Sequence, residues 1–209
     1  MSFFETIDTT RIAPLTGVSG EALMRTPAGL KRAEFIRPGD MLVTRSRGLQ
    51  TVRLIWKRVV GADEMRHDAD TVPVRLAARA LGPMMPSRPM MLAPAHRVLV
   101  PAFMLARDAG DGGLVEARAL AGGSDAAWRD RAAEGAVFYN FVFDRHEVIC
   151  ASGVPVESFH VTARAAAEVD EVTRHALLLR FPMLRQAQDA FPPAAYPMSP
   201  AEDYVPALV

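Results

Sequence analysis

The chain has 209 residues, of which 50% are hydrophobic and 23% are charged; this composition excludes a disordered protein and suits one globular domain with its own core. Its 24 Lys and Arg residues balance its 24 Asp and Glu residues, so no net positive field is available to hold a polyanion, and nucleic acid is not an expected partner. Cys150 is the only cysteine, which excludes a disulfide framework within the chain.

The first residues, MSFFETIDTT, lack the basic start and apolar run of a secretory signal peptide. No apolar stretch reaches the roughly 18 residues that would span a bilayer. We therefore expect a cytoplasmic protein without a membrane span, and export by a route without an N-terminal signal remains an open alternative.

Short runs of alternating polarity, separated by Gly and Pro turns, fill the first 160 residues. Val52, Leu54 and Trp56 in the run 51–60, and Val72, Val74 and Leu76 in the run 72–77, are apolar at every second position, as a half-buried strand requires. The run 137–143 (VFYNFVF) is apolar on both faces and predicts a central strand. Closely spaced short strands of this kind predict an all-β fold.

The pattern changes at Thr162, where helix-forming residues replace the alternation. Thr162 is the expected N-cap of one helix, and Pro182 is expected to end it. The apolar face of this helix is expected to contain Val169, Val172 and Ala176. Residues 191–209 hold five prolines and are expected to be extended or loosely docked.

Five segments, in their order along the chain, resemble the Hint domain, the module shared by hedgehog autoprocessing domains and inteins. They are 17–29 (GVSGEALMRTPAG), 35–44 (FIRPGDMLVT), 93–100 (APAHRVLV), 115–120 (VEARAL) and 138–158 (FYNFVFDRHEVICASGVPVES). The closest resemblance is to bacterial Hint-domain proteins. It implies an all-β horseshoe of short curved strands, to which a C-terminal helix has been added.

The same resemblance divides the chain into four parts. We expect a lead segment over 1–16, a Hint-like domain over 17–160, a helical extension over 161–190 and a Pro-rich tail over 191–209.

The resemblance also implies a chemistry, intramolecular acyl transfer with self-cleavage. In the family, a first-position Cys or Ser attacks the preceding carbonyl, and a His in the central block protonates the departing nitrogen. Here Gly17 stands at the nucleophile position, Ala93 replaces the usual hydroxyl residue, and Glu157-Ser158 replaces the terminal His-Asn of inteins. His96 matches the central His. The resemblance therefore implies that the N-to-S acyl shift is impaired in this chain, and that Gly17→Cys restores it if the scaffold is intact.

Other candidate catalytic residues surround these positions. His146 matches a family His that assists the shift, although it also suits a charged hairpin turn. Asp144 could orient His146 or His96, or accept hydrogen bonds within a turn. Ser19 is a possible substitute nucleophile, but a two-residue slip along a strand would displace the attacking atom by roughly 6–7 Å, so a turn-supporting hydroxyl is the simpler interpretation.

No metal or other cofactor is expected, because no pair of histidines has the i, i+4 helical spacing of a zinc site and no Cys pair accompanies them. Cys150 lies in the apolar run VICA, which predicts a buried, unreactive thiol rather than a hydrolase nucleophile. Two hypotheses remain: a self-processing domain with an impaired nucleophile, and a non-catalytic scaffold that binds a peptide or protein partner, as yet unknown.

Overall fold

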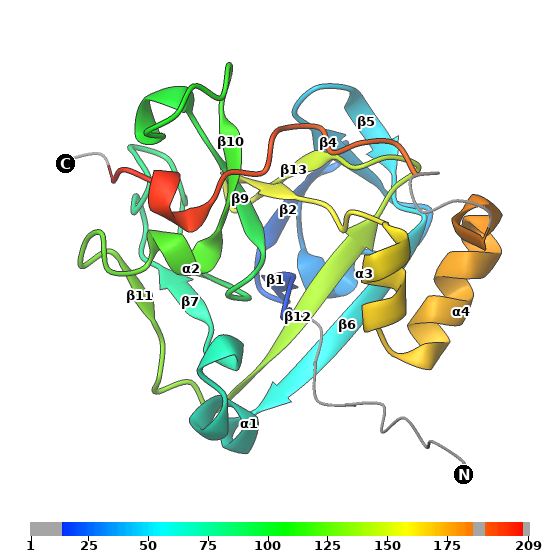
Figure 1. Cartoon of the computed structure of the whole chain (residues 1–209), viewed down its shortest axis with the longest axis horizontal. Helices are drawn as coiled ribbons and strands as arrows, with labels where there is room; N and C mark the ends of the chain where they lie inside the picture. The colour runs from blue at the N-terminus through cyan, green and yellow to red at the C-terminus, as the bar shows by residue number, and fades with distance from the viewer. Residues whose placement is uncertain (1–13, 186–190, 207–209) are drawn as a thin grey trace, which may run out of the picture.

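The computed structural model describes residues 14–185 and 191–206, and its strands form two antiparallel sheets (Figure 1). One sheet has six strands in the order β11-β7-β8-β1-β12-β6. Its strands are β1 (Val18–Ser19), β6 (Leu54–Gly61), β7 (Val74–Leu76), β8 (Met90–Leu92), β11 (Ala127–Arg129) and β12 (Gly135–Val142). β12 pairs with β1 on one side and β6 on the other, which confirms the central strand predicted at 137–143.

The second sheet has eight strands, six of them in the order β10-β9-β14-β13-β2-β3, with β4 pairing to both β13 and β5. Its strands are β2 (Leu23–Thr26), β3 (Gly29–Arg32), β4 (Met41–Thr44), β5 (Gly48–Thr51), β9 (Arg97–Val100), β10 (Gly113–Glu116), β13 (Val148–Ala151) and β14 (Val154–Glu157). Strands of two to eight residues dominate the described chain, so the expected all-β class is confirmed.

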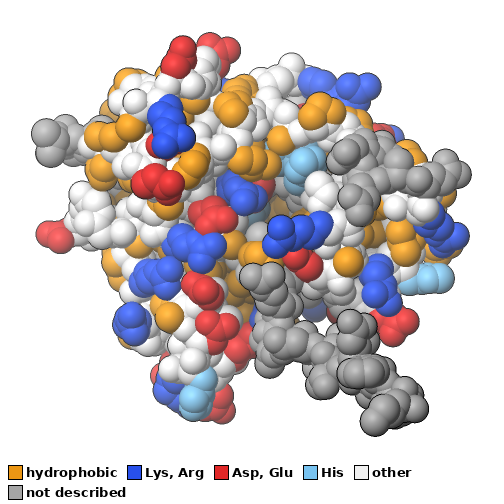
Figure 2. All heavy atoms as spheres, in the orientation of Figure 1, with side chains coloured by type: hydrophobic (Ala, Val, Ile, Leu, Met, Phe, Trp, Pro, Cys, Tyr) orange, Lys and Arg blue, Asp and Glu red, His pale blue; other side chains and the backbone are white. Residues whose placement is uncertain are grey.

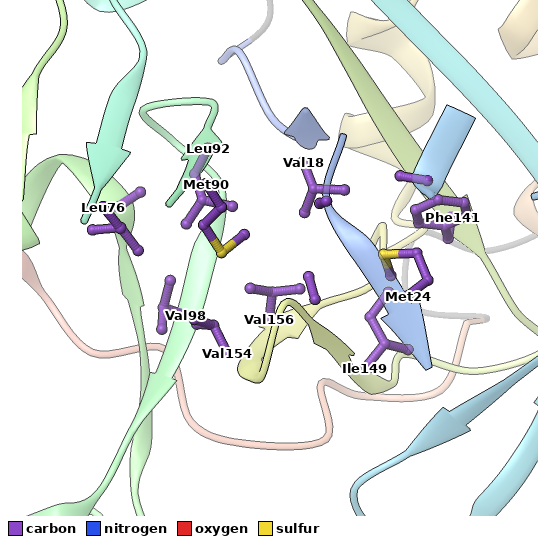
Figure 3. Close-up of a cluster of buried hydrophobic side chains, with 14 of the residues drawn as sticks. Val18, Met24, Leu76, Met90, Leu92, Val98, Phe141, Ile149, Val154 and Val156 are labelled. Carbon is purple, nitrogen blue, oxygen red and sulfur yellow. The ribbon is translucent and has the colours of Figure 1, made fainter. Parts of the chain in front are cut away.

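The main core draws side chains from both sheets, as Figure 3 shows. Leu76 of β7 and Phe141 of β12 are fully buried in it. Met24, Ile149 and Val156 join them from β2, β13 and β14. This shared apolar layer holds the two sheets together and fixes the strand ends that carry the site.

Short helices join or follow the strands. They are the α-helices α1 (Ala62–His67), α2 (Ala117–Leu120), α3 (Ala163–Glu168) and α4 (Glu171–Arg180), and the 3-10 turns η1 (Ala33–Phe35), η2 (Ala69–Thr71), η3 (Ala102–Met104), η4 (Pro182–Arg185) and η5 (Ala201–Asp203).

The expected C-terminal helix is present, but it is two helices, α3 and α4. Thr162 caps the first, accepting a hydrogen bond from the amide of Ala165 at 3.0 Å. Asp170 then caps a second start by accepting one from the amide of Thr173 at 3.0 Å, and this break rotates the residues that follow. Val172, which was expected on the apolar face of a single helix, is 80% exposed.

The described part of the C-terminal tail, residues 191–206, is docked along β10. The amide of Leu114 donates to the carbonyl of Pro197 at 2.8 Å, and the amide of Ser199 donates back to the carbonyl of Leu114 at 3.0 Å. In Figure 1 this orange-to-red segment crosses the molecule from the neighbourhood of α4 to β10.

Within residues 14–185 and 191–206, no helix combines the length and apolar character that crossing a membrane requires. Basic and acidic side chains are interspersed on the face shown in Figure 2, as the balanced charge of the sequence suggests.

Candidate functional site

A pocket with a volume of about 380 Å³ opens between the end of β14, the middle of β12 and helix α3. The side chains that line it come from sequence positions more than 100 residues apart. They include Thr16, His96, Asn140, Glu157, His160 and Glu168.

The chain just before β1 enters this pocket in an extended form. The amide of Ala95 donates to the carbonyl of Leu15, and the amide of Ala93 donates to the carbonyl of Gly17, both at 3.0 Å. Between them, Thr16 donates its hydroxyl proton to Asn140 Oδ1, and Asn140 Nδ2 donates to the carbonyl of Thr16, again at 3.0 Å. Residues 15–17 are thus hydrogen-bonded to Asn140 of β12 and to the segment 93–95, which directly precedes His96.

Gly17 has a backbone conformation and surroundings that only glycine suits. Its φ is +118°, and a Cβ atom added there would lie 2.9 Å from both the Tyr139 carbonyl oxygen and Asn140 Nδ2. The strand β12 therefore closes the space that a nucleophilic side chain would need.

Ser19 lies in β1 opposite Phe138, and its carbonyl accepts the amide of Ala22 at 3.0 Å in the following turn. Its role as a substitute nucleophile stays a prediction.

His96 is buried at the base of the pocket, with 3% of its surface exposed. Within the described residues neither of its ring nitrogens has a hydrogen-bond partner, and Nδ1 lies 3.9 Å from Glu157 Oε1. Burial lowers the pKa of His96 to about 4. The imidazole is therefore neutral at neutral pH and offers one donor and one acceptor.

Glu157 lies between His96 and His146. The sequence analysis identified it only as part of the pair that replaces the terminal His-Asn of inteins. Its Oε1 accepts the amide of Arg97 at 2.9 Å, and its Oε2 lies 3.6 Å from His146 Nε2. Burial opposes ionisation of Glu157, but His146, His96 and Arg97 outweigh that cost and lower the pKa of the carboxyl. Glu157 is thus a buried carboxylate that lies between His96 and His146, at distances longer than a hydrogen bond.

His146 has a fully buried side chain. The amide of Ala195 donates to its Nδ1 at 3.0 Å, which assigns the imidazole proton to Nε2, on the side of Glu157. The His160 ring lies against it, with 4.9 Å between ring centroids. The structure therefore brings His96 and His146 together around Glu157.

Two expectations from the sequence require correction. Asp144 is more than half exposed and forms ion pairs with Arg53 and Arg180, whereas the side chain of His146 is fully buried; the structure does not support an orienting role for Asp144. Cys150 lies in β13 but is only partly buried. Among residues 14–185 and 191–206, no group of three or more His, Cys, Asp or Glu side chains could hold a metal ion.

Replacing Glu157 with Ala should lower the free energy of unfolding by about 1–3 kcal/mol, because the change leaves the Arg97 amide without its hydrogen-bond acceptor. Chemical denaturation measures this loss. Glu168→Ala, at the same pocket but in the surface pair with Arg164, is the matched control and should cost no more than about 1 kcal/mol. Equal losses in the two variants would contradict a structural role for the Glu157 cluster.

Residues 18–163, well over half of the chain, match the family model of the Hint domain. Among solved structures, a bacterial intein-like domain from Clostridium thermocellum is similar to 70% of this chain over 100% of its own length, with 16% identity and a TM-score of 0.47. The gp41-1 intein covers 70% of this chain with 99% of its own, at 10% identity and a TM-score of 0.39. The MchDnaB-1 intein covers 69% with 99% of its own, at 13% identity and a TM-score of 0.39. No curated protein matches the chain.

Proposed function

Because this chain belongs to the Hint-domain family, we propose that it is a Hint domain in which the acyl shift at residue 17 has been lost, and in which the pocket around His96 binds a peptide segment. The family reaction begins when the first residue of the domain attacks the carbonyl before it. The lack of room for a side chain at Gly17 is the observation that supports the loss of the acyl shift. Glycine supplies no nucleophile, and the Tyr139 carbonyl and the Asn140 amide occupy the place of a Cβ.

The neighbouring hydroxyl does not compensate for this loss. Thr16 donates its proton to the side-chain carbonyl of Asn140, and an amide oxygen is a far weaker base than the imidazole or carboxylate that normally activates a hydroxyl. Thr16 is therefore held as a hydrogen-bond donor. His96 remains able to donate or accept a proton, but no acyl group is transferred for it to assist.

Peptide binding is favoured by the unpaired polar atoms that remain. Among residues 14–185 and 191–206, both ring nitrogens of His96 and Nε1 of Trp56 are buried without partners, and both residues line the pocket. Buried polar atoms are nearly always paired in complete assemblies. A peptide amide would supply a carbonyl for an N–H donor and an N–H for the imidazole acceptor, which is the complement these atoms lack.

The test of lost cleavage uses the full chain with a folded protein fused upstream. We expect its mass, measured under denaturing conditions, to remain that of the intact fusion after incubation with dithiothreitol. Thiol-dependent release of the upstream protein at Thr16-Gly17 would overturn the proposal.

The test of peptide binding follows the ring nitrogens of His96 by NMR during titration with a short extended peptide. Saturable shifts at His96 that are absent at the exposed His175 would support binding. Shifts of equal size at both histidines, or none, would refute it.

A further inference from the structure

The C-terminal segment 191–206 pairs with the edge of the eight-stranded sheet. β10 is the last strand of that sheet, and Leu114 forms a parallel bridge to Met198. Further along, the amide of Ala106 donates to the carbonyl of Asp203 at 2.7 Å, and the amide of Val205 donates to the carbonyl of Met104 at 2.9 Å. An open sheet edge exposes unpaired backbone groups, and this segment satisfies them here.

Two glycines of the domain leave room for the segment. A Cβ atom on Gly113 would lie 2.1 Å from Ser199 Oγ, and one on Gly123 would lie 2.6 Å from Pro206 Cγ. Neither glycine has the positive φ that would require glycine on backbone grounds. Their small size therefore serves the close approach of the segment.

The segment also reaches the histidines of the site. The amide of Ala195 donates to His146 Nδ1 at 3.0 Å. Next to this contact, the Phe191 ring lies 6.1 Å from the His160 ring, centroid to centroid, and His160 Nε2 lies 3.4 Å from the carbonyl of Pro192. An imidazole nitrogen accepts a hydrogen bond only while it carries no proton, so docking of Ala195 requires His146 to be unprotonated at Nδ1.

The charged and titratable groups around His146 come from several elements. Glu157 of β14 faces Nε2. His160 lies against the ring, and burial lowers its pKa. His96 and the Arg97 guanidinium lie beyond Glu157. On the connection that carries His146 itself, the buried Glu147 is paired with Arg47. Glu157 can stabilise a cation on Nε2, but nothing among these groups replaces the Ala195 contact once Nδ1 is protonated.

We propose that residues 191–206 form a latch, which stays closed over His146 and β10 while His146 is neutral and opens when His146 is protonated. Protonation of His146 Nδ1 places its N–H group against the N–H group of Ala195. The Ala195–His146 hydrogen bond is then broken, and the latch opens. The adjoining bonds of Pro197 and Ser199 to Leu114 are then expected to weaken with it, because these residues follow Ala195 by two and four positions on the same docked segment. Release exposes His146 and the β10 edge. This inference is independent of whether the pocket cleaves or binds a peptide.

Hydrogen exchange at single residues tests the latch. The full chain is followed from about pH 8 to about pH 5, and each rate is corrected for the intrinsic pH dependence of exchange. We expect the protection of the Ala195, Ser199 and Leu114 amides to fall by about tenfold or more in acid, while β12 amides such as that of Phe141 stay protected. Protection of the segment that is unchanged down to pH 5, or lost together with that of β12, would overturn the proposal.

His146→Asn removes the ring that can be protonated and keeps an acceptor, because the side-chain carbonyl of asparagine lies about where Nδ1 lies in histidine. Its segment should stay protected at both pH values. His175→Asn, at an exposed position of α4, should open in acid as the wild type does. Acid release from His146→Asn equal to that of the wild type would refute the role of His146.

A second set of variants tests the latch without changing a histidine. Gly113→Ala should weaken docking of the segment at every pH because its new methyl group meets the Ser199 side chain, and the second change Ser199→Gly should restore docking. Gly61→Ala, where a Cβ meets nothing within 4 Å, should leave it docked. Equal protection of the segment in Gly113→Ala and Gly61→Ala would contradict the latch even if His146→Asn failed to fold.

Discussion

Gly17→Cys is expected to lower the free energy of unfolding by about 2 kcal/mol or more and to leave an upstream fusion protein uncleaved. The sequence on its own suggested the opposite outcome, a thiol that restores cleavage. We expect no cleavage because the Cβ atom would lie 2.9 Å from the Tyr139 carbonyl oxygen, at a φ of +118°. Chemical denaturation and denaturing mass spectrometry measure the two outcomes.

Gly29→Cys is the matched control for this variant. Gly29 has a similar φ of +110°, but a Cβ atom there meets nothing within 4 Å. It should therefore show the backbone strain without the collision, and the difference between the two variants isolates the packing against β12. Wild-type stability together with thiol-dependent cleavage in Gly17→Cys would mean that β12 yields easily and that only the thiol is missing.

Stability should also depend on pH through His96. Its pKa is about 4 in the folded protein, against an ordinary value of 6.5, so the unfolded chain takes up a proton between these values that the folded chain refuses. This stability is fully present above about pH 6.5 and is lost as the pH falls towards about 4, a change of about 3 kcal/mol. Below pH 4.5, protonation of Glu157, whose pKa is also lowered in the folded protein, removes more.

His96→Gln should flatten this profile between about pH 6.5 and about pH 4, since glutamine does not titrate there. Urea denaturation at several pH values measures the slope, and His67→Gln, at an exposed position of α1, should retain the wild-type slope. An unchanged slope in His96→Gln would assign the acid sensitivity to another group.

The strands were predictable because local pattern determined them. Val74 and Leu76 alternate with Arg75, and the structure buries both in β7. Thr162 was recognisable as an N-cap for the same reason. The division into α3 and α4 was missed because Asp170 acts as the N-cap of a second helix. The helix-forming residues on both sides of it give no local signal of this break.

The site was only partly predictable, because its parts converge through tertiary pairing. His96 and His146 were identified from the family resemblance, but Glu157 was interpreted only as a missing His-Asn pair. Its position directly after the buried Val156, at the end of a strand, is the signal that could have indicated a buried carboxylate. The contacts of Thr16 with Asn140 and of Ala195 with His146 span 124 and 49 residues, and no local pattern encodes them.

The loss of the acyl shift is tested most directly by hydroxylamine trapping on the upstream fusion, followed by mass analysis of the peptides that cover residues 9–20. An ester or thioester formed at this junction would be captured as a hydroxamate on the residue before the nucleophile. We expect no hydroxamate on any residue of this segment. A hydroxamate on Thr16 would reveal attack on the Thr16 carbonyl by a nucleophile other than Gly17, such as Ser19, and one on Leu15 would reveal attack by the Thr16 hydroxyl; either result would contradict a pocket that binds without cleaving.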